Sequence, residues 1–316
     1  MPVNHPKAWK PIEPPPDITP SGFYVGAAGY DFDDWAGRFY SPPRTREPKA
    51  RTGLNRLAFY QTYFPFVEIH HTFDDEPQMS TFLDIERHSA ESIRYAVRVH
   101  RQISHVQKPD IKSAIDLMRR HIQAVSPLVE SGRFYTFLIQ LDDRLLRSQK
   151  RLDYLVAVAS EAVRHRLDVH IEFRHISWHH VYPIQVLKDN GIGICNTELP
   201  PAGSLFPLKA YATTDKGYIR YNGLNHENGR RRAHTAHGTG AESNGSQGSP
   251  RSRDNDYLYS EGEIEKRVTG QVTLSKKVSS LAIAYANCAR AQAVVNAIQN
   301  IRQLKQLSEF ASIRSP

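Results

Sequence analysis

The sequence predicts a single-domain α/β protein with the TIM-type (β/α)8 barrel fold. Eight short runs rich in β-branched and aromatic residues alternate with longer segments of helical periodicity. Eight parallel strands joined by right-handed helical crossovers close most simply into a barrel. An open doubly wound sheet is the alternative. No Gly-x-Gly-x-x-Gly motif follows the first run, which disfavours a dinucleotide-binding sheet of that kind.

The expected strands are short, and each ends where a longer helical segment or a polar stretch begins. The first strand starts near Phe23, after a proline-rich stretch that has no apolar periodicity. In chain order, strands are expected at 23–29, 66–73, 93–100, 134–141, 168–174, 191–198, 217–223 and 280–287.

The expected helices carry their apolar side chains on one stripe, as packing against a sheet requires. In the segment 152–167, this stripe is formed by Leu152, Leu155, Val156, Ala159 and Val163. The sixth connection carries three prolines and is expected to be irregular. The helices are expected near 55–64, 77–90, 111–126, 152–167, 181–190 and 260–270, and from residue 289 onward.

The barrel domain is expected to span residues 21–310. An extended proline-rich tail precedes it at 1–20, and a short C-terminal tail follows at 311–316. Within the domain, the segment 225–256 is rich in Gly, Ser, Asn and Arg and almost free of large apolar side chains. Such a segment cannot offset the entropy of ordering, so we expect a mobile insert there.

The composition predicts a soluble, cytoplasmic protein with anionic partners. The 316 residues are 40% hydrophobic, enough for one large core or two modest ones, and carry a net charge of +8 with a pI of about 9.4. The sequence contains no long apolar run, and the N-terminus has no basic region followed by an apolar one. We therefore expect neither a membrane span nor secretion. The composition leaves the oligomeric state open.

The densest cluster of basic residues lies in the segment 38–56. Six arginine and lysine residues there are accompanied by a single acid, Glu47. A solvated surface loop accounts for such a cluster. Contact with the phosphates of a nucleic acid accounts for it equally well and predicts an affinity that falls steeply with salt.

A polar site is predicted at residues 171–178, Ile-Glu-Phe-Arg-His-Ile-Ser-Trp, within a segment that otherwise has the character of a buried strand. Because side chains alternate along a strand, Glu172 and Arg174 point the same way, and Ile171 and Phe173 point the other way. Burying charge inside a sheet is unfavourable unless the charges meet partners or water. The pair therefore indicates the centre of a functional site.

Seven segments resemble, in order, the signature blocks of the YecE-like family, domain of unknown function 72. They are GAAGYDFDDWAGRFYSP, VEIHHTF, AVRVHRQISH, FLIQL, IEFRHISW, YIRYNG and AYANCARAQAVVNA, within residues 22–305. The resemblance implies a TIM-type barrel. It implies no reaction, because the activity of the family is not established. Tyr30, His70 and Ile176 stand where the family usually has Trp, Asn and Pro. These differences bear on ligand identity more than on fold.

The resemblance also matches single residues of this chain to family positions. They are Glu68, Arg98, His105, Gln140, Glu172, Arg174, His175, Ser177, Trp178, Arg220 and Asn287. Most of them lie near the carboxyl ends of the expected strands, where TIM-barrel enzymes form their active sites.

Three of these residues predict an anion site. Arg98, Arg174 and Arg220 come from strands three, five and seven, and alternate strands contribute to common layers in such barrels. A guanidinium group donates two parallel hydrogen bonds to a carboxylate or phosphate. Further substrate contacts are expected from Gln140, Trp178 and Asn287. For Trp178, the alternative is packing at the barrel rim.

The catalytic candidates are Glu172, Glu68 and His105. A carboxylate acts as a general acid or base when its surroundings tune its pKa, and histidine can shuttle protons. Each candidate has a structural alternative. The glutamates can neutralise arginines at the barrel mouth, and His105 can cap a helix or pack in the core. If both glutamates flank one cavity, a glycosidase-like pair is a further alternative.

The sequence does not favour a metal site and leaves the cofactor undetermined. Carboxylate and imidazole ligands from Glu68, His70, His105 and Glu172 suit several divalent ions. However, no compact ligand motif such as His-Glu-x-x-His is present. The two cysteines lie in separate apolar segments with no second ligand at metal spacing.

These observations predict an enzyme that acts on an anionic small molecule, such as a phosphorylated sugar or a nucleotide-like compound, by acid/base chemistry at the C-terminal face of the barrel. Nucleic-acid binding or processing through the basic segment 38–56 is one alternative. A barrel that serves only as a ligand-binding or interaction module is another. The sequence has no Gly-x-Ser-x-Gly motif to support a serine hydrolase and no P-loop motif to support a nucleoside triphosphatase.

Overall fold

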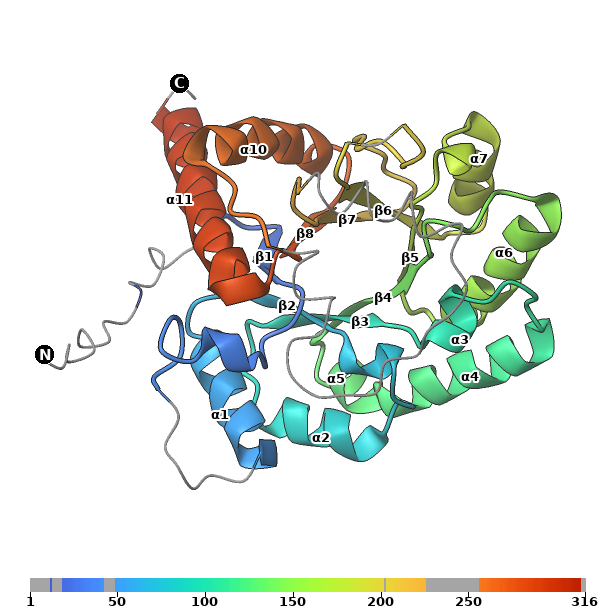
Figure 1. The fold of residues 1–316 in the computed structure, drawn as a ribbon, viewed down its shortest axis with the longest axis horizontal. Coiled ribbons are helices and arrows are strands. Elements are labelled where there is room, and N and C mark those ends of the chain that lie inside the picture. The colour runs from blue at the N-terminus through green and yellow to red at the C-terminus, as the bar shows by residue number, and fades with distance from the viewer. Residues whose placement is uncertain (1–11, 13–18, 43–48, 202, 226–255, 314–316) are drawn as a thin grey trace, which may run out of the picture.

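A closed barrel of eight parallel strands forms the centre of the molecule (Figure 1). The computed structural model describes residues 12, 19–42, 49–201, 203–225 and 256–313. The strands are β1 (Phe23–Ala27), β2 (Phe66–Ile69), β3 (Arg94–Arg98), β4 (Phe134–Gln140), β5 (Val169–Glu172), β6 (Gly193–Glu198), β7 (Lys216–Tyr221) and β8 (Ser280–Tyr285). They pair in sequence order, and β8 closes on β1. The predicted TIM-type barrel is confirmed.

Helices surround the barrel on its outer side (Figure 1). They are α1 (Lys49–Tyr60), α2 (Met79–Arg87), α3 (Arg101–Ser104), α4 (Ile111–Ala124), α5 (Ser126–Glu130), α6 (Gln149–Arg164), α7 (Val181–Asp189), α10 (Glu261–Ser275) and α11 (Gln292–Ile313). Short 3₁₀ helices are η1 (Asp33–Trp35), η2 (His71–Phe73), η3 (Ile176–Trp178) and η5 (Ala289–Ala291).

Helix α1 begins at Lys49, earlier than the predicted start at residue 55. Its first residues, Lys-Ala-Arg-Thr-Gly, have no apolar periodicity to mark them as helical. The sixth connection contains no helix among its described residues 199–201 and 203–215, in agreement with its prolines.

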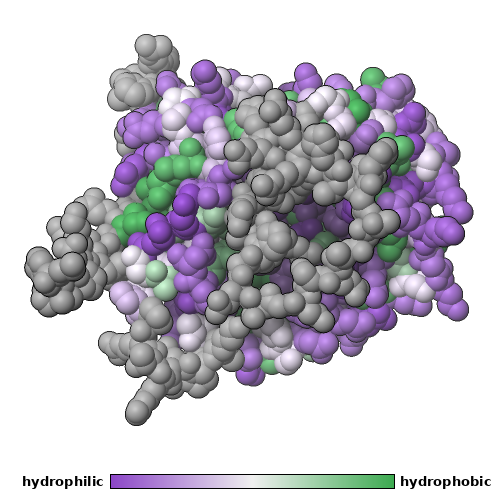
Figure 2. Space-filling view, in the orientation of Figure 1, coloured by the Kyte–Doolittle hydropathy of each residue, from purple (hydrophilic) through white to green (hydrophobic). Residues whose placement is uncertain are grey.

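The predicted domain boundaries fall mostly outside the described residues. This holds for nearly all of the tail at 1–20 and of the insert at 225–256. At the other end, α11 continues to Ile313, beyond the boundary expected at residue 310. Among the helices of the described ranges, none combines the length and apolar character that crossing a bilayer requires. In Figure 2, hydrophilic side chains predominate over α4 and α6.

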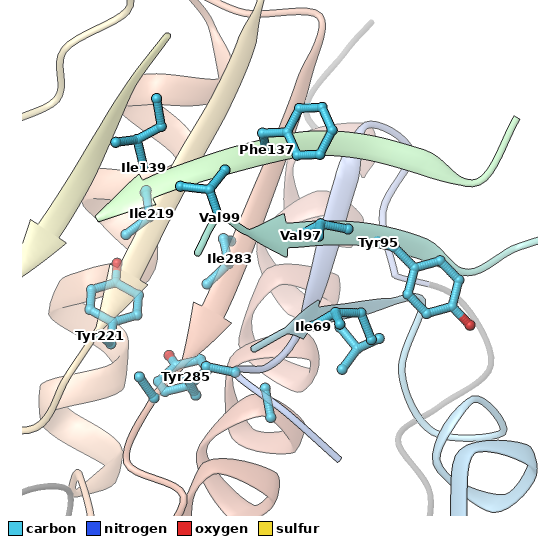
Figure 3. Close-up of a cluster of buried hydrophobic side chains, with 14 of the residues drawn as sticks. Ile69, Tyr95, Val97, Val99, Phe137, Ile139, Ile219, Tyr221, Ile283 and Tyr285 are labelled. Atoms are coloured by element: carbon cyan, nitrogen blue, oxygen red, sulfur yellow. The ribbon is translucent and has the colours of Figure 1, made fainter. Parts of the chain in front are cut away.

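The two faces of the strands bury different side chains, as strand alternation requires. One face packs against the helices and is apolar; it carries Ile69, Val97, Ile139, Ile219 and Ile283 (Figure 3). The opposite face fills the interior of the barrel with a smaller cluster that includes Phe66, Ala96, Leu138, Cys195, Tyr218 and Ala282. Full burial of a large apolar side chain contributes roughly 1.5–3 kcal/mol, so both layers stabilise the barrel.

The seam between β1 and β2 depends on a glycine. Gly26 pairs with Phe66, and a Cβ atom at Gly26 would lie 1.8 Å from the Phe66 carbonyl oxygen. The hydroxyl of Tyr60, from α1, accepts a hydrogen bond from the Ala27 N–H at 2.7 Å and donates one to the Phe66 carbonyl at 2.8 Å. One helix side chain therefore joins the two strands at their closest approach.

Candidate active site

A group of polar side chains lies at the carboxyl ends of the strands and faces the barrel interior. We call it the polar cluster; it consists of Glu68, Arg98, Gln140, Glu172, Arg174 and Arg220. Arg98, Gln140 and Glu172 are the last residues of β3, β4 and β5. Their sequence neighbours Val97, Ile139 and Ile171 belong to the apolar layer under the helices, so strand alternation turns the polar residues inward.

Arg220 binds both glutamates of the polar cluster. Its Nε and Nη2 atoms donate to the two carboxylate oxygens of Glu68 at 2.7 and 3.1 Å, and its Nη1 donates to Glu172 Oε2 at 2.5 Å. Arg220 is 4% exposed, and neither glutamate exceeds 1%. A buried ion network of this kind connects β2, β5 and β7 across the barrel. Removing one partner would leave an uncompensated buried charge.

Glu68 is fully engaged by its neighbours. Besides the two bonds from Arg220, its Oε2 atom accepts a hydrogen bond of 2.5 Å from the hydroxyl of Tyr218, which lies one layer deeper in the barrel. Both carboxylate oxygens of Glu68 thus have strong donors. This arrangement fits the alternative in which Glu68 balances charge at the barrel mouth.

Glu172 is held as a carboxylate at the centre of the polar cluster. Its Oε1 atom accepts a hydrogen bond of 2.9 Å from Gln140 Nε2 and lies 3.6 Å from Arg174 Nε. Burial alone would raise the pKa of Glu172, but Arg220, Arg174 and the Gln140 hydrogen bond outweigh it and hold the pKa below its usual value. Glu172 is therefore ionised at neutral pH, and both of its oxygens are engaged by neighbouring side chains.

Arg98 differs from the other two arginines of the polar cluster. Its guanidinium carbon lies 3.6 Å from the centroid of the Phe73 ring, and its Nε atom is buried without a hydrogen-bond partner among the described residues. Burial, followed by the charge of Arg220, lowers the pKa of Arg98 to about 10, so the side chain is still a cation at neutral pH. In the described ranges, no carboxylate lies within ion-pair distance of Arg98.

His105 lies beside Arg98 on the same aromatic ring. Its imidazole packs edge-on against Phe73 at 4.8 Å, and its Nδ1 atom is 2.9 Å from the hydroxyl of Ser104. Burial, followed by the charge of Arg98, lowers the pKa of His105 to about 4. His105 is therefore neutral at physiological pH, and its uncharged ring can donate one hydrogen bond and accept another.

Two predicted substrate contacts lie outside the polar cluster. Trp178 is fully buried, stacks on Phe173 at 4.6 Å, and donates its Nε1 hydrogen to the Leu145 carbonyl at 2.8 Å. Phe173 faces the helices and not the barrel interior, so Trp178 packs in the apolar layer, as the alternative to substrate contact expects. Asn287 is also fully buried; its Nδ2 atom donates to the Tyr257 carbonyl and to Asn296 Oδ1, at 2.7 and 2.8 Å. It joins the end of β8 to α11.

The structure gives the three arginines of the predicted anion cradle different partners. Arg98, Arg174 and Arg220 do belong to one cluster, but three nitrogen atoms of Arg220 already bind Glu68 and Glu172. Arg220 thus acts as an internal counter-ion for the two glutamates. The sequence shows the spacing of charges but cannot show which acid pairs with which base.

Two residues that contact the candidate site were not identified from the sequence. Tyr218 donates to Glu68, and Phe73 supports both Arg98 and His105. Strand alternation contains the signal for Tyr218, because it lies two residues before Arg220 and shares its face. No such signal marks Phe73, which lies in η2 after β2.

The residues suggested for a metal do not come together as ligands. Within the described ranges, no group of three or more His, Cys, Asp or Glu side chains is arranged to hold a metal ion. Glu68 and Glu172 both form ion pairs with Arg220. The His70 ring stacks on Phe32 with 5.5 Å between ring centroids, and burial lowers the pKa of His70 to about 4.

Fold and site together define a TIM-type barrel with buried glutamate and arginine side chains at the carboxyl ends of its strands. Residues 24–315 match the family model described as "Protein of unknown function DUF72". The chain belongs to the DUF72 family, which confirms the resemblance found in its sequence.

Solved structures of the same family have the same fold. A DUF72 family protein from Thermotoga maritima is 26% identical, with a TM-score of 0.72, and the match covers 91% of this chain and 99% of that one. A DUF72 family protein from Enterococcus faecalis is 19% identical, with a TM-score of 0.68 and coverages of 90% and 95%. The search of curated proteins gave no match.

Proposed function

We propose that the protein is an enzyme that binds an anionic small molecule through Arg98 and Arg174 and moves a proton through Glu172. The observation that supports this most directly is Arg98, a half-buried cation whose buried Nε–H has no acceptor among the described residues. Buried polar groups are normally hydrogen-bonded, and an exception calls for a ligand or another explanation. A bound carboxylate or phosphate oxygen would supply the acceptor.

Glu172 is the general base in this proposal. Arg220 and Gln140 fix both of its oxygens, and its lowered pKa keeps it ionised. A positioned base of this kind typically contributes 10²–10⁴-fold to a reaction rate. Arg174 lies 3.6 Å from Glu172, so an anion bound by Arg174 would be presented directly to the base.

The test begins with a thermal-shift screen of phosphorylated sugars, nucleotides and small carboxylates. Ligands that stabilise the wild type should lose most of this effect in Arg98→Gln and in Arg174→Gln. They should keep it in Arg101→Gln, a control whose arginine is 56% exposed and lies 3.6 Å from Asp74. If the ligands stabilise Arg98→Gln as much as they stabilise the wild type, the proposed anion site is wrong.

A second measurement separates catalysis from binding. Glu172→Gln should still bind the ligands found in the screen, whereas any turnover of them by the wild type should fall by at least about 100-fold. Unchanged turnover in Glu172→Gln would exclude Glu172 as the base. If ligands bind in an Arg98-dependent way but the wild type turns over none of them, the result favours a non-catalytic ligand-binding module.

The nucleic-acid alternative has less support from the described residues. Arg56, in the basic segment 38–56, is held by Asp31 and Asp33 at 2.5 and 3.0 Å, so its charge is already compensated. Residues 43–48 of this segment lie outside the described ranges. Nucleic-acid binding by this segment therefore stays a prediction, to be tested by the salt dependence of affinity.

A further inference from the structure

We infer that the substrate group at Arg98 carries a single negative charge, as a carboxylate or a phosphodiester does, and that a phosphomonoester dianion is disfavoured. This inference rests on the proposed function, because it names the chemical class of the ligand bound at that site. It narrows the expectation from the sequence, which includes phosphorylated sugars.

The first argument is the pairing of charges in the polar cluster. Glu68 is within ion-pair distance of Arg220, and Glu172 is within ion-pair distance of both Arg220 and Arg174. Two carboxylates thus face three guanidiniums, and Arg98 has no carboxylate within that distance in the described ranges. One positive charge is left for a ligand to neutralise.

The second argument is that the groups around Arg98 do not add further positive charge. Phe73 covers one face of its guanidinium, and His105 and His70, with pKa values of about 4, are neutral at physiological pH. Asp142, which acts on His105, is itself paired with Arg144 at 2.8 Å. A dianion would therefore leave one negative charge uncompensated beside Glu172, where the low dielectric strengthens repulsion.

The experiment compares two tetrahedral oxyanions of different charge, perrhenate (−1) and sulfate (−2). Neither changes its charge near neutral pH. Dissociation constants are measured by calorimetry at pH 7.5 and constant ionic strength, for the wild type and for variants. The two ions differ in hydration, but this difference cancels when the ratio of their dissociation constants is compared between variants.

In the wild type, perrhenate should bind at least about tenfold more tightly than sulfate. Glu172→Gln removes one negative charge from the polar cluster and so raises its surplus positive charge by one. The variant should therefore change the ratio of the two dissociation constants by about tenfold or more in favour of sulfate. Glu68→Gln makes the same change of charge and serves as a second variant if Glu172→Gln does not fold. Arg98→Gln should weaken both ions, and the exposed-site control Arg101→Gln should change neither.

The outcomes separate this inference from the proposed function. The inference alone would be overturned if binding depends on Arg98 but sulfate binds as tightly as perrhenate or more tightly. It would also be overturned if both glutamate variants leave the ratio of the two dissociation constants unchanged. Binding of neither ion, or binding that does not depend on Arg98, would overturn the proposed function as well. Acetate and dimethyl phosphate, both monoanions, are then tested for competition with perrhenate. Competition by either supports the inference and identifies the group, whereas competition by neither contradicts it.

Discussion

Arg220 is the residue on which the polar cluster depends most. It is buried and is the common partner of Glu68 and Glu172. Replacing a buried ion pair as a whole is often tolerated, but removing one partner typically costs 3–5 kcal/mol, because the other charge stays buried without compensation. Here a single replacement would affect two buried carboxylates.

We predict that Arg220→Gln lowers the free energy of unfolding by about 3–5 kcal/mol. Arg101→Gln is the matched control, because Arg101 and Asp74 are each more than half exposed, and exposed pairs contribute about 0–1 kcal/mol. Urea denaturation followed by circular dichroism measures both values. Similar values for the two variants would show that Arg220 does not neutralise buried charge.

The hydroxyl of Tyr218 permits a second residue-scale prediction. Tyr218 donates to a carboxylate, whereas Tyr135, also in the barrel interior, donates to the carbonyl of Gly217 at 2.8 Å. Hydrogen bonds to charged groups contribute about 1.5–3 kcal/mol and neutral ones about 0.5–1.5 kcal/mol. Tyr218→Phe should therefore destabilise the protein more than Tyr135→Phe does, as measured by urea denaturation. The reverse order would contradict a stronger hydrogen bond at Tyr218 than at Tyr135.

At the scale of elements, the barrel closes tightly between β1 and β2. The backbone of β2 passes so near Gly26 that no side chain fits between the strands. Strand β1 also pairs with β8 over five residues, Phe23 to Ala27. A side chain at Gly26 must therefore displace β2 or disturb the pairing with β8.

Gly26→Ala should destabilise the protein by about 3 kcal/mol or more, because overpacking a rigid backbone contact cannot be relieved by a side-chain rotation. Gly270→Ala is the control. Gly270 lies in α10, where an added methyl group would meet open space, and alanine there should stabilise the helix by about 0.5–1 kcal/mol. Thermal unfolding should move the two midpoints in opposite directions. A Gly26→Ala variant as stable as the wild type would show that the seam is adaptable.

At the scale of the whole molecule, buried histidines link stability to pH. His121 lies in α4 and accepts a hydrogen bond from the His100 N–H at 3.0 Å, and His170 lies inside the barrel. Burial lowers the pKa of His121 to about 3 and that of His170 to about 4. Unfolded histidine titrates near 6.5, so below that pH the unfolded state binds more protons than the folded state does.

The free energy of unfolding should therefore fall as the pH is lowered from about 6.5 toward 4, by up to roughly 1.4 kcal/mol per pH unit for each such histidine. Urea denaturation at pH 7.5, 6.0 and 5.0 gives the slope. Below pH 6.5, His121→Gln should reduce the slope by the amount that corresponds to the uptake of about one proton on unfolding. An unchanged slope in His121→Gln would mean that His121 is protonated in the folded protein.

The sequence by itself determined the barrel and the positions along the chain of the polar side chains that face its interior. Period-two alternation around Glu172 and Arg220 and the helical stripe of 152–167 are local patterns, and each is readable without knowledge of distant residues. The start of α1 could not be read in this way, since its first residues carry no apolar stripe.

Only the tertiary structure decided how the charges of the polar cluster are shared. Glu68 and Arg220 are separated by 152 residues, and Glu172 and Arg220 by 48, yet barrel closure brings them within hydrogen-bond distance. The same closure buries Trp178 against Phe173 and leaves Arg98 against Phe73 without a carboxylate among the described residues. Alternation fixes the face of each side chain within its strand, but pairing depends on distances between strands, which are set only when the barrel closes.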